Sequence, residues 1–135
     1  MRAIYAGVIL DPTAREELKT WFATLSPLRE KGLAHHMTWA FKPTSEEVRN
    51  LPVGQPVTLK VIGYVDREGV QAVVVEGAET RNAIAHVTVA VDQGVSPVHS
   101  NTVLAGGYTP LVGPELTGRW GWFDGKGDQF TLPVE

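Results

Sequence analysis

Two short segments of the chain share the pattern His–apolar–Thr–apolar–Ala–apolar. The first is HMTWAF at residues 36–41, and the second is HVTVAV at residues 86–91. An imidazole has an unperturbed pKa near 6.5, so it can give or take a proton near neutral pH. A threonine hydroxyl can donate a hydrogen bond to a phosphate oxygen. Two such pairs in one cleft would suit the cleavage of a phosphodiester, in which one histidine removes a proton and the other protonates the departing oxygen.

Strand alternation predicts which side chains of the two segments act together. Successive residues of a strand point to opposite faces, so His36 should share a face with Thr38, and His86 with Thr88. The same alternation adds Ala40 and Lys42 to the first polar face, and Ala90 and Asp92 to the second. The expected core-facing residues are Met37, Trp39, Phe41, Val87, Val89 and Val91. The neighbouring His35 belongs to the core-facing side or to the strand entrance, so we expect it not to join the same site, to shape the start of the strand, and to be replaceable at modest cost.

Other interpretations of the two segments stay open. A lone histidine is more often a structural residue than a catalytic one, and threonine is common in this chain. A zinc site is a further alternative, but the sequence has no His-x-x-x-His pattern on a predicted helix and no carboxylate-bracketed histidine pair. We therefore expect no metal ion and no other cofactor.

Four further residues are candidates for substrate binding. Tyr5 lies on the predicted first strand and could stack on a nucleobase, although strand aromatics are also common in cores. Lys42 could meet phosphate or lie in solvent at the strand end. Ser100 and Asn101 belong to a polar segment at 93–102, directly after the second motif, and could cap a pocket. Both residue types are equally ordinary at helix ends.

Composition limits the class of protein. The chain has 135 residues, 43% hydrophobic and 20% charged, which is typical of a single globular domain over residues 1–135. The net charge is −3 and the 12 Lys and Arg residues are scattered, which argues against a long nucleic acid as partner but allows a small nucleotide. Cysteine is absent, which excludes thiol nucleophiles, disulfides and cysteine-based zinc sites. Asp11 and Pro12 interrupt the first apolar stretch, so we expect neither a signal peptide nor a membrane span, and a cytoplasmic location.

The pattern of apolar residues and turn signals predicts an α+β domain. We expect a strand at 2–10, an amphipathic helix at 12–25, a strand at 35–41, a short helix at 44–51, two strands within 55–77 around a turn at 66–69, a strand at 83–92, a short helix at 96–104, and a hairpin at 116–134 with its turn at 124–127. Asp11 is a candidate N-cap for the first helix, and Pro12 suits the first helical position.

The duplicated motif, with its strand context, resembles the 2H phosphoesterase superfamily. The resemblance runs from the first strand to at least Gly107, and its specific part is HHMTWAF and HVTVAV. The stretch HVTVAVDQGVSPVHSNTVL is also similar to the cyclic phosphodiesterase module of fungal and plant tRNA ligases. The resemblance implies a two-lobed, pseudo-symmetric α+β fold with antiparallel sheets around a central cleft.

The resemblance also implies an activity. It is that of a metal-independent phosphodiesterase acting on 2′,3′-cyclic phosphates or on related 2′-linked or cyclic nucleotides. His36 and His86 would be the acid–base pair, with either order possible, and Thr38 and Thr88 would hold the phosphate. The chain is short for this family, which favours a small nucleotide or short oligonucleotide, as for compact phage members that degrade cyclic oligonucleotide signals. The runner-up function is a nucleotide-binding module that sequesters the same ligand without turnover.

Overall fold

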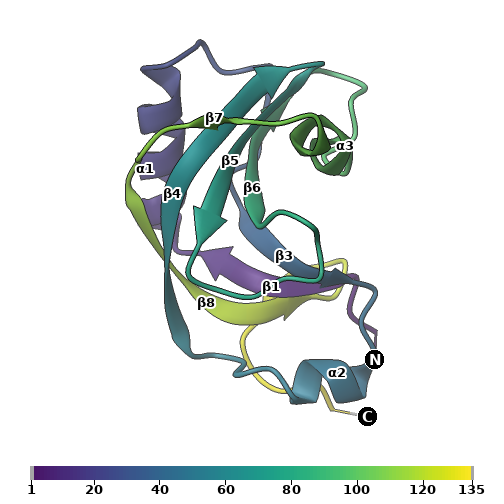
Figure 1. The fold of residues 1–135 in the computed structure, drawn as a ribbon. Coiled ribbons are helices and arrows are strands. Elements are labelled where there is room, and N and C mark those ends of the chain that lie inside the picture. Colours follow the sequence, from purple (N-terminus) through teal and green to yellow (C-terminus); the bar gives the residue numbers. More distant parts are fainter. Residues whose placement is uncertain (1, 135) are drawn as a thin grey trace.

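A computed structural model describes residues 2–134, and within this range nine strands and three helices form an α+β fold (Figure 1). The strands are β1 (Tyr5–Leu10), β2 (Lys31–Gly32), β3 (His36–Phe41), β4 (Pro56–Arg67), β5 (Val70–Glu76), β6 (His86–Val91), β7 (Thr109–Pro110), β8 (Glu115–Phe123) and β9 (Asp128–Gln129). The helices are α1 (Pro12–Ala23), α2 (Ser45–Arg49) and α3 (His99–Ala105). The α+β prediction is confirmed.

The strands form one antiparallel sheet that closes on itself. Among the described residues, the order β4–β5–β6–β3–β1–β8 returns to β4, because β4 pairs with both β5 and β8. The long strand β4 closes the ring because its two ends have different partners. Residues 56–60 pair with β8, and residues 60–67 pair with β5. Figure 1 shows β4 running along most of the height of the molecule. A two-lobed symmetry is not apparent from this single sheet and stays a prediction.

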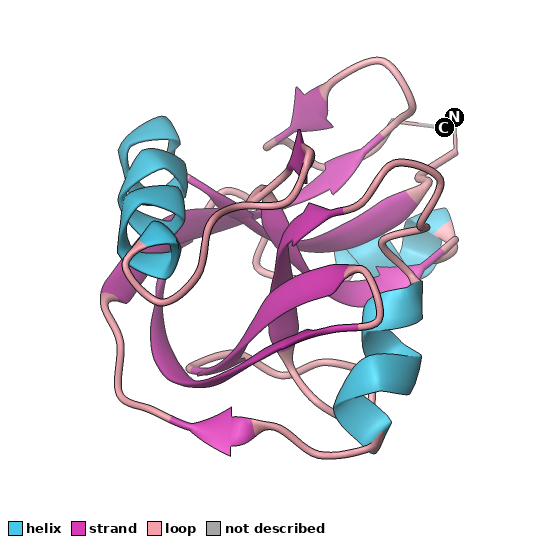
Figure 2. Cartoon of the chain, turned by 90° about the horizontal axis from the view of Figure 1, so that it is seen from above, coloured by secondary structure: helices cyan, strands magenta, loops and turns pink. Residues whose placement is uncertain are grey.

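The interior of the ring holds the larger of two hydrophobic clusters. Its largest members include Met37, Trp120 and Trp122 from the strands and Leu18 and Phe22 from α1. Leu18 and Phe22 are completely buried, and each such side chain contributes about 1.5–3 kcal/mol by leaving water. The second cluster lies outside the ring, where Val103 and Leu104 of α3 pack on strand residues 72 and 74. Figure 2 shows the helices flanking the strands on opposite sides.

Local signals in the sequence determine the element ends. Pro12 occupies the start of α1, while Asp11 stands at the N-cap without a side-chain hydrogen bond to the helix. Thr44 and Glu47 form the reciprocal capping box of α2. The turn between β4 and β5 uses Glu68 and Gly69 at positive φ. The two-residue strands β2 and β7 were not predicted, since so short a pairing leaves no alternation in the sequence.

Both motif strands contain the same irregularity, and it overturns part of the expected alternation. Trp39 is an extra residue opposite β1, where Thr38 pairs with Gly7 and Ala40 with Ala6. Val89 is likewise extra opposite β5, where Thr88 pairs with Ala72 and Ala90 with Gln71. A bulged residue reverses the alternation beyond it. The predicted faces are therefore wrong after the bulges: both alanines join the core, Phe41 is 63% exposed, and Val91 packs in the outer cluster with α3.

None of the helices within residues 2–134 has the length and apolar character needed to cross a membrane.

Candidate active site

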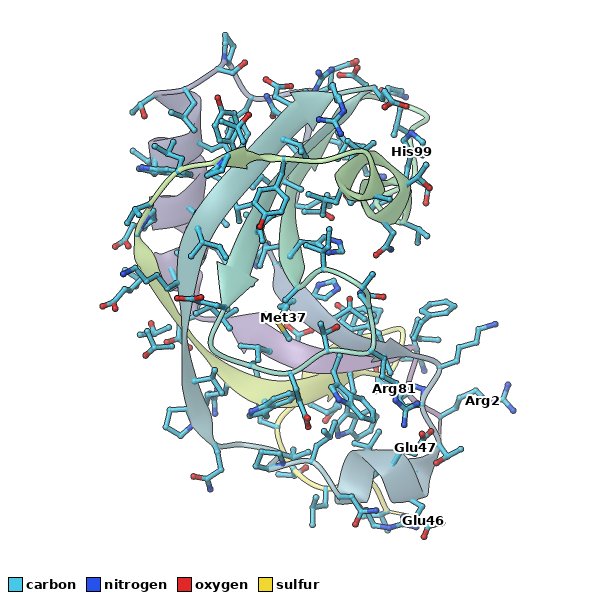
Figure 3. The ribbon with its side chains drawn as sticks, viewed as in Figure 1. Arg2, Met37, Glu46, Glu47, Arg81 and His99 are labelled. Carbon is cyan, nitrogen blue, oxygen red and sulfur yellow. The ribbon has the colours of Figure 1, made fainter. Side chains whose placement is uncertain are left out.

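The two motifs lie on neighbouring antiparallel strands and meet around one residue pair. In the described chain, Met37 of β3 pairs with Val87 of β6, and both side chains are completely buried in the inner core. The residues on either side of this pair face away from that core. Because the strands run in opposite directions, Thr38 lies toward His86 and His36 toward Thr88. Figure 3 labels Met37 in the interior, at the level where these strands meet.

The entrance to β3 departs from extended geometry. The amide of Ala34 donates to the carbonyl of Thr88, while Met37 already pairs with Val87, so His35 and His36 form an insertion between these two contacts. Ala34 has φ +48°, in the left-handed region. Alternation therefore does not apply to His35. Its ring lies beside the ring of His36, with centroids 5.2 Å apart, so of the two expected positions His35 takes the strand entrance and not the core-facing side.

His36 is held in an aromatic environment that favours its neutral form. Its ring stacks on Tyr5 with centroids 3.9 Å apart and planes 12° from parallel. Burial is the largest cause that lowers the pKa of His36 to about 3, and electrostatic coupling to His35, His86 and Arg15 acts in the same direction. A neutral imidazole has one nitrogen without a proton, so His36 can accept a proton at neutral pH.

His86 is also neutral but is fixed in a different way. It is only 8% exposed, and its Nδ1 lies 2.9 Å from the carbonyl oxygen of Ile84. A carbonyl only accepts, so Nδ1 carries the proton of the neutral ring and Nε2 is bare. Burial lowers the pKa of His86 below its ordinary value, and the hydrogen bond to Ile84 opposes this effect.

The two threonines have different supports. The hydroxyl of Thr88 lies 2.8 Å from the hydroxyl of Ser100 on α3. Ser100 is completely buried, so this contact between α3 and β6 restricts the orientation of the Thr88 hydroxyl. Thr38 is supported through its main chain, because its carbonyl accepts a 2.7 Å hydrogen bond from the Thr80 hydroxyl.

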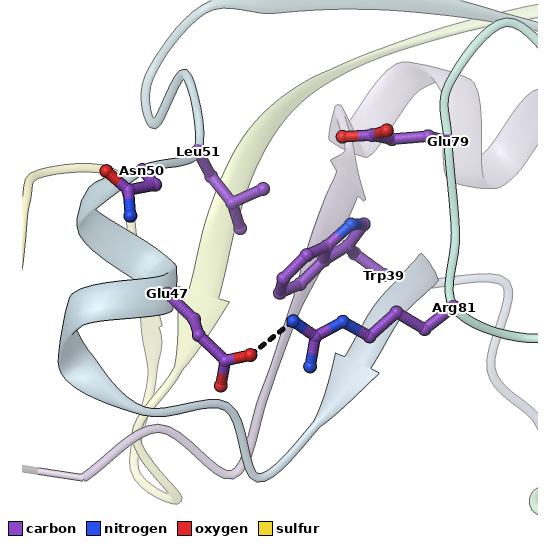
Figure 4. A pocket seen from close by; sticks show the side chains of 6 residues that line it. All are labelled: Trp39, Glu47, Asn50, Leu51, Glu79 and Arg81. Atoms are coloured by element: carbon purple, nitrogen blue, oxygen red, sulfur yellow. Dashed lines mark hydrogen bonds and ion pairs between the residues drawn. The ribbon is translucent and has the colours of Figure 1, made fainter.

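The segment between β5 and β6 contacts the second half of β3, the part of this strand that no longer pairs with β6. The amide of Arg81 donates to the carbonyl of Trp39, and the Arg81 guanidinium lies 4.2 Å from the centre of the Trp39 ring. Arg81 also forms an ion pair with Glu47 of α2, as Figure 4 shows. These contacts provide partners for β3 carbonyls that β6 no longer reaches.

The structure brings most, but not all, of the predicted site residues together. Tyr5 adjoins His36, but its ring also stacks on Phe123 of β8, with centroids 5.2 Å apart. Both neighbouring strands thus contribute a ring to Tyr5, which gives Tyr5 a supporting role beside His36, and its contact with a nucleobase stays a prediction. Ser100 adjoins Thr88, yet its burial prevents contact with a ligand at the surface.

Two predicted binding residues lie elsewhere. Lys42 follows the β3 bulge with φ +51°, and its ammonium lies 5.5 Å from the Phe41 ring. It lines a surface hollow with Arg2 and Thr44 instead of sharing the face of His36. Asn101 is exposed, and its side-chain amide donates to the carbonyl of Val98.

Two residues of the site were missed from the sequence, His35 and Asp128. The Nδ1 atoms of His35 and His36 lie 3.0 Å apart, and His35 Nε2 lies 2.9 Å from a carboxylate oxygen of Asp128 on β9. Asp128 pairs with Phe123, which pairs with Tyr5 on β1. The predicted turn at 124–127 was the available signal for Asp128, but it did not indicate that β8 would lie beside β1.

Within residues 2–134, no group of three or more His, Cys, Asp or Glu side chains is arranged to hold a metal ion. The site offers two neutral imidazoles and two hydroxyls on adjacent strands, a set of groups that can move protons and donate hydrogen bonds to an anion. No protein-family model and no curated protein sequence matches the chain.

Proposed function

We propose that the protein is a metal-independent phosphodiesterase of the 2H type, acting on 2′,3′-cyclic phosphates or on related 2′-linked or cyclic nucleotides. The observation that carries this proposal is the arrangement of His36, Thr38, His86 and Thr88 around the buried Met37–Val87 pair. It provides two proton-transfer groups and two hydroxyl donors on one side of two adjacent strands. A phosphodiester needs this combination, because its cleavage requires a base, an acid and stabilisation of the phosphate oxygens.

In the proposed reaction, His36 is the base and His86 the acid. His36 has its pKa lowered to about 3, so its ring is neutral at neutral pH and one nitrogen is free to accept a proton. A bound phosphate anion strengthens this weak base, because charge attraction favours the protonated imidazole. The resulting hydroxide attacks phosphorus, and the bond from phosphorus to one ribose oxygen breaks. His86, once protonated, gives its proton to that oxygen, so a cyclic phosphate and water yield a phosphomonoester and a free hydroxyl. An anionic phosphate nearby favours the protonated form of His86 by charge attraction.

Thr38 and Thr88 have the role of donors to the non-bridging phosphate oxygens. Ser100 positions the Thr88 hydroxyl through their 2.8 Å contact. The matching bulges at Trp39 and Val89 give the two motifs the same local backbone irregularity, which supports the proposed relationship between two halves around a common cleft. The net charge of −3 supports a small nucleotide over a long nucleic acid as substrate.

The test is hydrolysis of a panel of 2′,3′-cyclic mononucleotides, 2′–5′-linked oligoadenylates and cyclic di- and trinucleotides, with and without EDTA. We expect turnover of at least one class, unaffected by EDTA. The variants His36→Ala and His86→Ala should each lower turnover by about 10²–10⁴-fold. Ligand affinity should largely survive, which calorimetry can measure.

Two outcomes would contradict this function. Unchanged turnover in both histidine variants would remove the acid–base mechanism. Tight binding of a nucleotide by the wild type, with no turnover of any member of the panel, would favour the sequestering module instead.

A further inference from the structure

Asp128, His35 and His36 form a continuous chain of side-chain contacts. The carboxylate of Asp128 lies 2.9 Å from His35 Nε2, and His35 Nδ1 lies 3.0 Å from His36 Nδ1. The three residues come from two segments that are distant in the sequence: Asp128 lies on β9, and His35 and His36 lie at the entrance to β3. The contact between His35 and His36 is partly buried, whereas the contact between His35 and Asp128 lies at the surface, with side chains 22% and 29% exposed.

The chemistry of these contacts determines where the protons lie. An ionised carboxylate only accepts, so His35 Nε2 must carry a proton to bond Asp128. In a neutral His35 ring, Nδ1 is then bare and can only accept. His36 Nδ1 faces this bare nitrogen at 3.0 Å, where two lone pairs would repel, so His36 Nδ1 must carry a proton. In the neutral His36 ring the bare nitrogen is therefore Nε2. The Tyr5 hydroxyl, 3.2 Å from His35 Nδ1, can share that acceptor without altering this outcome.

We propose that His35 and Asp128 are positioning residues that hold the catalytic base His36 in its Nδ1–H tautomer, with Nε2 bare for proton removal. When His36 Nε2 takes a proton, the ring becomes cationic and its Nδ1–H bond to His35 strengthens. The Asp128 carboxylate stabilises that charge through the His35 ring. This extends the arrangement in which a base is oriented by a third group, here with a second imidazole between carboxylate and base.

The catalytic role of His35 and Asp128 rests on the proposed function, but the tautomer of His36 can be tested without turnover. The chain contains four histidines, so a long-range ¹H–¹⁵N spectrum of uniformly labelled protein resolves four imidazoles. In such a spectrum the bare and protonated ring nitrogens differ widely in ¹⁵N shift. The tautomer of His36 is thus read directly, whether or not a substrate has been found.

The experiment compares the wild type with Asp128→Asn, His35→Asn and His35→Ala at neutral pH. We expect a single Nδ1–H tautomer for His36 in the wild type. An asparagine at position 35 can keep an acceptor near His36 while losing the link to Asp128, so the tautomer should be partly retained. In His35→Ala and Asp128→Asn the His36 signals should shift toward a mixture of tautomers. On a hydrolysed substrate, Asp128→Asn should lower kcat by about 10–100-fold with KM little changed.

His99→Asn is the matched control. His99 lies on α3, where Figure 3 labels it well away from Met37, and its ring faces Glu68 at 3.6 Å. This variant should leave both the His36 tautomer and turnover unchanged. Observation of His36 as the Nε2–H tautomer in the wild type, or the same His36 signals in His35→Ala as in the wild type, would overturn the proposal. Absence of hydrolysis combined with the expected spectra would refute the function but not the positioning.

Discussion

The two His–x–Thr strands have nearly the same backbone and different surroundings. Each has a buried apolar residue between histidine and threonine, and each has one extra residue directly after the threonine. In the first strand, aromatic and imidazole side chains surround His36. In the second, a main-chain carbonyl fixes His86 and a buried serine fixes Thr88.

One repeated sequence pattern can therefore supply two histidines with different chemical properties. The backbone geometry places a histidine and a threonine on the same face in both strands. The neighbours then decide the protonation behaviour of each histidine, since burial, nearby charges and hydrogen bonds determine its pKa. The following predictions test whether the two strands differ as their surroundings indicate.

The largest effect is expected where β1 supports the first motif. Gly7 pairs with Thr38, and a Cβ at this position would lie 2.0 Å from the carbonyl oxygen of Met37. Gly7→Ala should lower the free energy of unfolding by about 3 kcal/mol or more. The clashing atom belongs to the main chain of β3, which can move away only by distorting the sheet. The corresponding residue on β5 is already Ala72, paired with Thr88. Ala72→Gly should cost only about 1 kcal/mol. Urea unfolding of both variants checks the contrast, and equal losses would contradict it.

The two threonines should both matter for turnover. Thr38→Val and Thr88→Val each remove a hydroxyl donor while keeping the side-chain shape. A hydrogen bond to a charged group is worth about 1.5–3 kcal/mol, so each variant should lose about 10–100-fold in kcat/KM. Steady-state kinetics on the best substrate measures this. A loss confined to one strand would show that phosphate is held from one side only.

The pH dependence of kcat/KM should report the different histidine environments. His36 as base must be neutral, which holds above its pKa of about 3. His86 as acid must be protonated, and burial lowers the pKa of His86 below its ordinary 6.5. We therefore expect kcat/KM to be highest in the acidic range and to fall about tenfold per pH unit above the pKa of His86. His86→Asn should remove this alkaline decline from the residual activity. A kcat/KM that rises through pH 6–8 would contradict the assignment of a protonated histidine as the acid.

The smallest effect is expected beneath α3. Ser100→Ala leaves the Thr88 hydroxyl without its buried partner, at a cost of about 1 kcal/mol in the free energy of unfolding. Turnover should fall only a few-fold, since Thr88 itself remains. Asn101→Ala on the same helix is the matched control and should alter neither quantity, because Asn101 is exposed. Thermal unfolding and kinetics of the two variants give the comparison.

The sequence predicted those parts of the structure that depend on neighbouring residues. The short helix expected at 44–51 and the turn expected at 66–69 depend on local hydrogen bonding, here the capping box of α2, and on φ preferences at Gly69. The shared face of His36 and Thr38 follows from strand alternation over three residues. The exposure of Phe41 could not be predicted, since a bulge depends on the register with a partner strand.

The contribution of Asp128 to the site was beyond sequence reasoning for a related reason. It lies 93 residues from His35 and reaches it because β9 pairs with β8 and β8 with β1. Alternation and turn signals identify hairpins, but they do not state which strands will be neighbours in a closed sheet. His35 was misjudged because the left-handed backbone at Ala34, a non-glycine residue, has no sequence signal.

The single pairing between β3 and β6 has a mechanical consequence. Over the described residues, β3 pairs with β1 at five positions and with β6 at one, while β6 pairs with β5 at five. Residues 31–34, directly before β3, also bond to β6, so the gap in the main-chain pairing is limited to the insertion at His35 and His36. The spacing of His36 and His86 would therefore change at this insertion at less cost than within either pair of strands, and a ligand between the histidines would bind where the backbone is least constrained.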